Sequence, residues 1–265
     1  MERNLLNCDM ESHQIMKKNI VFIVLSVFLM HNHVAMAADA LGWNRVFVVG
    51  YGVAHANQTQ ILRLANTPLP GLENRYVGGS SHYGAALFGL ALEKEYATAS
   101  EHVIGTLGVE ADYLRDNAVT GTVEPFYNIS PDFDELKYFY DIHTFLLQAT
   151  AKLTKQQLFY DLGGYAGVGL GVAVNRLSDY REYSPDDSSA APMLSPFGNK
   201  DTINPSLSAG LGLTYKMGRF TRISLGYRFF YTGEARLKKS PVQQSNKSIA
   251  LSPISYHFLM LGLSV

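Results

Sequence analysis

The fold is decided by residues 158–175, which read LFYDLGGYAGVGLGVAVN. Large apolar side chains alternate here with small ones, and a period of two is the period of a β-strand. One face holds Leu158, Tyr160, Leu162, Ala166, Val168, Leu170, Val172 and Val174. The opposite face holds Asp161, Gly163, Tyr165, Gly167, Gly169, Gly171, Ala173 and Asn175. An apolar outer face with a glycine-rich inner face favours a strand of a membrane β-barrel with a crowded interior.

The N-terminus predicts export from the cytoplasm. Lys17 and Lys18 precede an apolar run over residues 20–30, and residues 35–37, Ala-Met-Ala, supply the small side chains of a signal-peptidase site. The run is too short to cross a bilayer as a helix, so a retained anchor is the weaker alternative. We therefore predict a signal peptide with an upstream start extension in residues 1–37 and one barrel domain in residues 38–265.

Composition narrows the class of protein further. The 22 basic and 23 acidic residues nearly balance, so the chain carries no charge signature of nucleic-acid binding. The only cysteine, Cys8, lies in the predicted signal segment, which leaves no disulfide or thiolate metal site in the mature chain. The 23 glycines suit a narrow barrel interior, and the 16 tyrosines suit the two membrane interfaces.

The same alternation predicts eight strands. They cover residues 46–54, 84–96, 103–114, 136–152, 158–175, 206–216, 222–232 and 251–265. Four long connections alternate with three short ones, which predicts an up-and-down antiparallel barrel with long outer loops, short periplasmic turns and both termini in the periplasm. In the fourth strand Phe145, Leu146 and Leu147 interrupt the alternation, and a β-bulge would explain them. The facing of the fourth and eighth strands stays open.

Several segments carry a resemblance to a known family. The predicted signal peptide, the eight-strand rhythm, residues 165–171 (YAGVGLG) and residues 225–229 (LGYRF) resemble small outer-membrane barrels of the opacity-protein and OmpA transmembrane-domain type. The alternating C-terminus resembles the signal read by the outer-membrane assembly machinery, although it ends in Val265 and not in an aromatic residue. The resemblance implies the outer membrane of Gram-negative bacteria, with structural, adhesive or minor pore-forming roles.

Charged side chains gather on the predicted inner faces. They are Glu93, Glu95, Glu110, Asp112, Asp141, His143, Asp161, Lys216, Arg222 and Arg228. An eight-stranded barrel has an interior that side chains just fill, so we expect these charges to pair as a structural plug of the lumen. The alternative is a small, weakly selective diffusion pore in which the same charges act on passing ions.

An enzyme is the least favoured alternative. His257 near Ser255, or His143 near Asp141, could be imagined in a lipid-modifying or proteolytic site at the outer rim. Neither pair supplies a nucleophile, a base and an orienting third group. We therefore predict no enzymatic activity and no cofactor.

The outer loops offer a surface for recognition. Phe126, Tyr127 and Phe133 are aromatic residues of the second long loop, and acidic residues accompany them. The spacing of the acidic residues Asp132, Asp134 and Glu135 does not match that of a calcium-binding loop, so no metal site is predicted. The expected partners are outer-membrane lipids and lipopolysaccharide, the assembly machinery, and a host or surface ligand at the outer loops. The sequence names neither that ligand nor an oligomeric state.

Overall fold

A computed structural model describes residues 42–63, 71–78, 82–100, 102–116, 118–129, 136–185, 197–217, 221–239 and 247–265. The predicted signal peptide, residues 1–37, lies outside this part of the chain. The chain divides into two compact units, residues 1–44 and 45–265, and the second unit is described below. In the described ranges no helix is long and apolar enough to cross a membrane.

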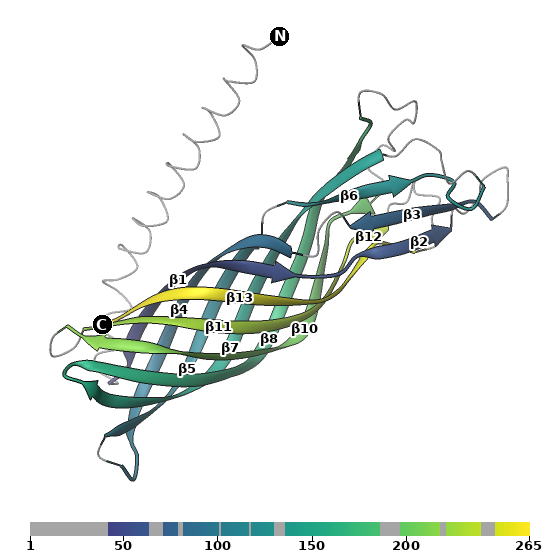
Figure 1. Ribbon diagram of the computed structural model, residues 1–265. Coiled ribbons are helices and arrows are strands. Elements are labelled where there is room, and N and C mark those ends of the chain that lie inside the picture. Colours follow the sequence, from purple (N-terminus) through teal and green to yellow (C-terminus); the bar gives the residue numbers. More distant parts are fainter. Residues whose placement is uncertain are drawn as a thin grey trace, which may run out of the picture. The chain divides into compact units, whose positions relative to one another are not determined.

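Eight long strands close into a ring of antiparallel neighbours (Figure 1). They are β1 (Asn44–His55), β4 (His82–Ala97), β5 (Val103–Asp116), β7 (Leu136–Phe159), β8 (Leu162–Tyr183), β10 (Lys200–Lys216), β11 (Arg222–Arg236) and β13 (Ala250–Ser264). The order around the ring is β7-β5-β4-β1-β13-β11-β10-β8, and β8 pairs again with β7. The predicted eight-stranded up-and-down barrel is therefore confirmed.

Large apolar side chains cover the outside of this ring. The exposed set includes Val49, Tyr51, Val53, Phe88, Leu90, Leu92, Leu107, Val109, Tyr113, Phe145, Leu147, Leu153, Val168, Leu170, Val172, Leu207, Leu211, Leu213, Leu225, Tyr227, Tyr231, Leu259, Leu261 and Leu263. We call this set the apolar belt. Leu170 and Leu259 are each 64% exposed, which in water would be costly and in lipid is favourable. The ring is a transmembrane barrel.

The alternation settles the facing of the two strands that the sequence left open. In β7 the odd-numbered side chains Phe145 and Leu147 are exposed, whereas Leu146 between them is fully buried. The pairing of β7 with β5 and β8 runs through these residues without a shift, so the predicted bulge at residues 145–147 is wrong. The register shifts at Phe139/Asp141 instead. In β13 Leu259, Leu261 and Leu263 face outward.

The turn between β7 and β8 differs from the prediction. The predicted strands 136–152 and 158–175 leave a short connection between residues 152 and 158, but β7 continues to Phe159 and the turn lies at Tyr160 and Asp161. Residues 153–155 are paired with β5, and Lys155 lies opposite Val103. Residues 154–156 are polar because this end of β7 extends beyond the apolar belt. Their polar composition resembles that of a turn.

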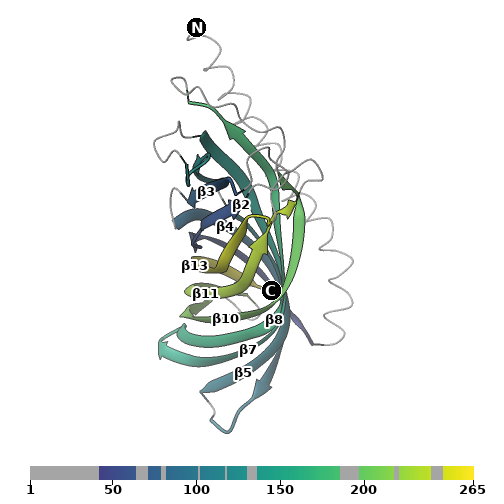
Figure 2. The ribbon, with the colours of Figure 1, turned by 90° about the vertical axis from the view of Figure 1, so that its right-hand side faces the viewer.

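Beyond one end of the ring the sheet continues, with β2 (Thr59–Arg63), β3 (Glu73–Gly78) and β6 (Val119–Glu124). β2 pairs with β3, β3 with β6, and β6 with the first residues of β7. A small second sheet joins β9 (Phe197–Gly198) to β12 (Lys238–Lys239). We call β2, β3 and β6, with the paired ends of β7 and β8, the extension. Figure 1 shows β2, β3 and β6 at the end of the barrel opposite the C-terminus, and Figure 2 shows β2 and β3 from a second side.

The hydrophobic core continues from the barrel into the extension. The buried side chains of the extension include Leu62, Tyr76, Val119, Val123, Leu136, Tyr138, Tyr140 and Tyr180, and Phe197 of β9 packs against Tyr76 and Tyr180. The Tyr138 ring stacks against Tyr140 and Tyr180, with centroids 6.1 and 5.7 Å apart. Burial raises the pKa of the Tyr76 phenol, which therefore stays neutral. The segments predicted as long loops thus contain packed strands.

Candidate functional site: the barrel lumen

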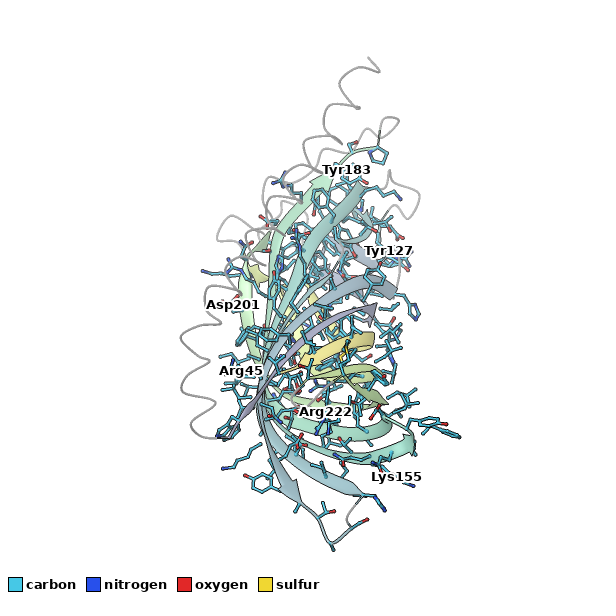
Figure 3. All side chains as sticks on the ribbon, turned by 90° about the vertical axis from the view of Figure 1, so that its left-hand side faces the viewer. Arg45, Tyr127, Lys155, Tyr183, Asp201 and Arg222 are labelled. Carbon is cyan, nitrogen blue, oxygen red and sulfur yellow. The ribbon has the colours of Figure 1, made fainter. Side chains whose placement is uncertain are left out.

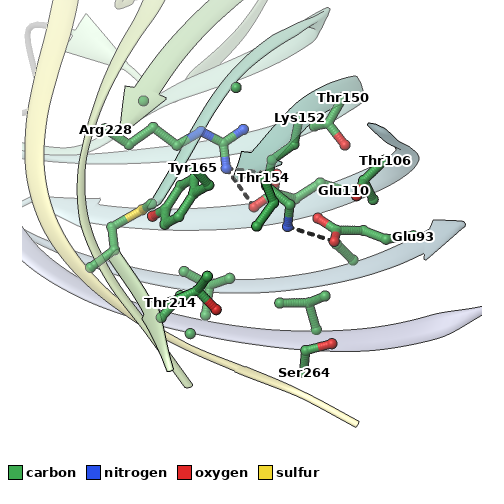
Figure 4. Close-up of a pocket in the computed structure, with 18 of the residues that line it drawn as sticks. Glu93, Thr106, Glu110, Thr150, Lys152, Thr154, Tyr165, Thr214, Arg228 and Ser264 are labelled. Carbon is green, nitrogen blue, oxygen red and sulfur yellow. Dashed lines mark hydrogen bonds and ion pairs between the residues drawn. The ribbon is translucent and has the colours of Figure 1, made fainter. Parts of the chain in front are cut away.

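The lumen near the C-terminal end of the barrel holds a cavity of about 110 Å³ (Figure 4). Four strands, β4, β5, β7 and β11, contribute carboxylates and cations to its wall, and threonines complete it. Lys152 Nζ lies 2.6 Å from Glu93 Oε2, and Arg222 pairs with Glu95. The cavity wall is therefore charged but paired, and its volume suits a few water molecules.

Arg228 of β11 forms the centre of the deepest ion pair. Its Nη1 donates to Glu110 of β5 at 2.6 Å, and its Nη2 donates to Ser208 Oγ at 2.9 Å and Gln148 Oε1 at 3.1 Å. The guanidinium also lies 4.6 Å from the ring centroid of Phe230. The side chains of Arg228 and Glu110 are only 11% and 5% exposed. The hydrogen bonds of this one guanidinium group thus connect β11 with β5, β7 and β10 across the lumen.

Asp112 lies two residues beyond Glu110 on the inner face of β5. It is fully buried, and neither carboxylate oxygen has a hydrogen-bond partner among the described residues. Its Oδ1 occupies the space that a side chain on Gly89 of β4 would need. Gly89 therefore makes room for this carboxyl group, a second acid beside the single cation Arg228.

A layer of apolar side chains fills the lumen next to the charged layer. Leu87, Leu114, Leu146, Phe230 and Phe258 are all fully buried. The Phe230 and Phe258 rings meet edge to face with centroids 5.9 Å apart. We call these five residues the apolar layer. The sequence analysis did not identify this layer. Leu87, Leu114 and Phe230 share the inward parity of the charged residues on their strands, whereas Leu146 and Phe258 lie on the two strands whose facing the sequence left open.

Towards the extension a buried polar network follows the apolar layer. Tyr256 Oη donates to Asp116 Oδ2 at 3.2 Å and lies 3.0 Å from Thr144 Oγ1. Thr144 donates to Asn175 Oδ1 at 2.9 Å, and Asn175 donates to the carbonyl of Thr232 at 2.8 Å. These bonds tie five strands together across the interior.

The structure places the ten predicted lumen residues in three different environments. Glu93, Glu95, Glu110, Asp112, Arg222 and Arg228 face the lumen, and the first three acids are paired with cations. Asp161 is exposed in the turn between β7 and β8, and Lys216 is exposed at the last residue of β10. Their predicted place in the lumen is wrong because both lie at the rim, where strand parity no longer buries a side chain.

Asp141 and His143 were also expected in the lumen and lie on the outer face instead. Both have the parity of the exposed Phe145 in β7. His143 Nδ1 lies 2.8 Å from the hydroxyl of Tyr113, which belongs to the apolar belt. Their place in the lumen assumed one of the two facings that the sequence left open for the fourth strand, and β7 has the other.

The two histidines considered for catalysis have similar surroundings. His143 bonds to Tyr113, and His257 Nδ1 lies 2.5 Å from the hydroxyl of Tyr227. Each histidine therefore has a tyrosine as its partner at the edge of the apolar belt. In the described part of the chain, no group of three or more His, Cys, Asp or Glu side chains could hold a metal ion.

Two of the three loop aromatics proposed for recognition are described. Phe126 and Tyr127 lie in the turn after β6, where Phe126 has a φ of 53° and its N–H donates to Asn74 Oδ1 at 3.1 Å. The Arg75 guanidinium covers the Tyr127 ring at 4.1 Å and also pairs with Glu124 at 2.6 Å. Phe133 lies outside the described residues. Figure 3 shows Tyr127 and Tyr183 towards one end and Lys155 towards the other.

Comparisons with known proteins give matches of fold. No protein-family model and no curated protein sequence matches the chain. Among solved structures, the neisserial surface protein A (NspA) is 14% identical, with 83% of this chain and 96% of that chain covered and a TM-score of 0.40. OprG from Pseudomonas aeruginosa is 15% identical, with 83% and 95% covered and a TM-score of 0.38.

The outer-membrane protease OmpT from Escherichia coli is 10% identical, with 84% of this chain and 95% of that chain covered and a TM-score of 0.45. OprG and OmpT are outer-membrane proteins, the class that the sequence resembles. A transmembrane barrel of antiparallel strands with a lipid-facing apolar belt is the construction of that membrane's proteins.

Proposed function

We propose that this protein is an outer-membrane barrel with a closed lumen, which presents its extension at the cell surface and has a structural or surface-recognition role there. The observation that carries the proposal is the complete burial of the apolar layer. Its five side chains come from five strands and offer an ion no polar groups to replace its hydration, so we expect them to block passage through the lumen. A barrel closed in this way acts through its ends and its outer face.

The extension supports a role at the surface. Its hydrophobic core holds β3 and β6 in a fixed arrangement, so the turn at Phe126 and Tyr127 is presented on a rigid support. Arg75, Glu124 and Tyr127 combine a cation, an anion and an aromatic ring in one cluster. Clusters of this composition are common at recognition surfaces.

A small pore is the alternative function. The charged cavity beside Glu93 and Arg222 favours it, because such a wall would accept ions from the periplasm. The apolar layer beyond the cavity counts against it. We further propose that the protein has no enzymatic activity, since the tyrosine partners of His143 and His257 supply neither a nucleophile nor an orienting acid for those rings.

Cysteine labelling on whole cells tests which end faces outward. Tyr127→Cys should react with a membrane-impermeant maleimide on intact cells, whereas Lys155→Cys should react only after the outer membrane is permeabilised. The reverse pattern would contradict the proposed orientation.

An adhesion assay tests the recognition role. Cells that express the protein should adhere to epithelial monolayers more than cells with an empty vector, and Arg75→Ser with Tyr127→Ser should remove the gain. Lys94→Gln, at the other end of the barrel, is the matched control. Equal adhesion of all four strains would reject surface recognition and leave the structural role.

A further inference from the structure

Basic side chains terminate the apolar belt at the end that faces the extension. On six of the eight long strands a histidine or an arginine follows the apolar run on the outward face, directly on five of them and after Gly84 on β4. These residues are His55 on β1, His82 on β4, Arg115 on β5, His143 on β7, Arg176 on β8 and His257 on β13. We call them the basic girdle. None of them was recognised from the sequence as part of a common feature.

Neighbouring members of the basic girdle lie side by side. Arg115 is directly opposite His143, and His143 is directly opposite Arg176, so three basic residues form a row across β5, β7 and β8. Cross-strand neighbours of this kind have Cβ atoms about 4.5–5.5 Å apart. The rings of His55 and His82 meet on β1 and β4 with centroids 4.7 Å apart.

Acidic residues border this row without neutralising it. Asp201 of β10 is opposite Arg176, with the Nε to Oδ1 distance at 3.9 Å and both side chains more than half exposed. A contact that long between exposed groups is weak, and an arginine has five N–H donors to share. Asp141 and Asp179 lie near His143 on the side of the extension. The guanidinium groups therefore remain available to a further anion.

The next outward residues towards the membrane are apolar or aromatic, so they favour an anion that carries acyl chains. The row Arg115, His143 and Arg176 stands directly above Tyr113, Phe145 and Val174, which are outward residues of the same three strands. A ligand held by both rows needs an anionic head at the level of the arginines and acyl chains at the level of the belt. Arginine matches phosphate through paired N–H donors.

We propose that the basic girdle, with Arg115 and Arg176 at its centre, binds the phosphate groups of lipopolysaccharide in the outer leaflet while the acyl chains cover the apolar belt. The proposal rests on the proposed orientation, with the extension outside the cell. It places a specific lipid contact on one side of the barrel, over β5, β7 and β8, and not evenly around it.

Lipid binding in detergent tests the proposal. The purified protein is titrated with bisphosphorylated lipid A and with the same lipid after removal of both phosphates. We expect the phosphorylated lipid to bind about tenfold more tightly, and Arg115→Gln with Arg176→Gln to remove most of that difference, since each basic residue near an anionic surface is worth roughly 1 kcal/mol. Lys94→Gln with Lys155→Gln, basic residues at the opposite end of the strands, is the matched control.

Three results would overturn the proposal. They are equal binding of the two lipids, equal behaviour of the arginine variant and the control variant, and full displacement of lipid A by millimolar inorganic phosphate, which would indicate a site for a free anion. Binding in micelles does not depend on which end of the barrel faces outward. A failure here is therefore distinct from a failure of the proposed orientation, which the cysteine labelling reports.

Discussion

At the scale of the residue, Arg228 is the cation on which the most deeply buried ion pair, that with Glu110, depends. Glu110 is paired with it and is 5% exposed, while Asp112 is fully buried two residues further along the same strand. A buried carboxylate without a partner is far more costly than the pair is favourable. Arg228 therefore stabilises the fold mainly because its removal would leave the buried carboxylate of Glu110 without a partner.

We predict that Arg228→Ala destabilises the folded barrel by about 3–5 kcal/mol, because Glu110 would lose its cation in a buried position. Unfolding by urea in lipid vesicles, followed by tryptophan fluorescence, measures the loss. Arg228→Ala with Glu110→Gln should recover part of it, since the double variant no longer buries an unpaired carboxylate at position 110. A variant with the stability of the wild type would show that this pair contributes nothing.

Gly171 of β8 gives a prediction about strand spacing. A Cβ at this position would lie 2.0 Å from the carbonyl oxygen of Leu147 and 2.6 Å from the Cα of Gln148, both in the neighbouring β7. Because both atoms belong to the backbone, Gly171→Ala must move the strands apart, and we expect a loss of about 1–3 kcal/mol.

Gly105→Ala in β5 is the control for this prediction, because the nearest atom there would be a Thr98 methyl group at 3.5 Å. The thermal unfolding temperature of both variants in detergent is the measurement. If the two glycine variants melted together, close packing between β7 and β8 would not be the reason for the glycine.

Period-two parity predicted six of the ten lumen residues correctly, because on regular strands such as β4, β5 and β11 it fixes the facing of every residue. It failed at Asp141 and His143, where one wrong assignment for strand four turned both side chains to the other face. It failed at Asp161 and Lys216 because parity carries no information about where a strand leaves the barrel. In the apolar layer, parity fixes the facing of Leu87, Leu114 and Phe230, but Leu146 and Phe258 lie on the two strands whose facing stayed open. The packing of the layer depends on five strands at once.

At the scale of the element, the extension shows that the long connections are structured. β2 and β3 occupy the first of them and β6 the second. They are short and lie beyond the apolar belt, so the run of alternating apolar residues that identifies a membrane strand is absent from them. Their positions depend on contacts with the ends of β7 and β8, which no local pattern reveals.

The extension should unfold independently of the barrel. We predict that Tyr76→Ala, which removes a buried ring between β2 and β6, makes β2, β3 and β6 sensitive to trypsin while the barrel stays resistant. A buried aromatic residue of this size is worth about 3–5 kcal/mol, which exceeds what a small sheet can lose. Limited proteolysis with mass spectrometry of the fragments is the measurement.

Tyr76→Phe is the control for the extension, because it keeps the ring and removes only the hydroxyl group. It should show the fragment pattern of the wild type. Cleavage within the barrel strands of Tyr76→Ala would mean that the two parts unfold together, and the extension would not be a separate cooperative unit.

At the scale of the whole molecule, the lumen is a stack of layers with different chemistry. The paired charges lie beside the cavity, the apolar layer follows, and the network around Tyr256 and Asp116 adjoins the extension. Each layer alone would narrow the lumen. The apolar layer is the one that excludes ions, because it offers no polar groups to replace their hydration.

The most direct test of this account is the conductance of the purified protein in a planar lipid bilayer, recorded for the wild type and for Arg228→Ala. The account predicts that neither shows regular current steps, because the apolar layer stays in place when the charged layer is broken. Reproducible steps from the wild type would contradict the closed lumen, and steps from Arg228→Ala alone would show that the charges, and not the apolar layer, close it.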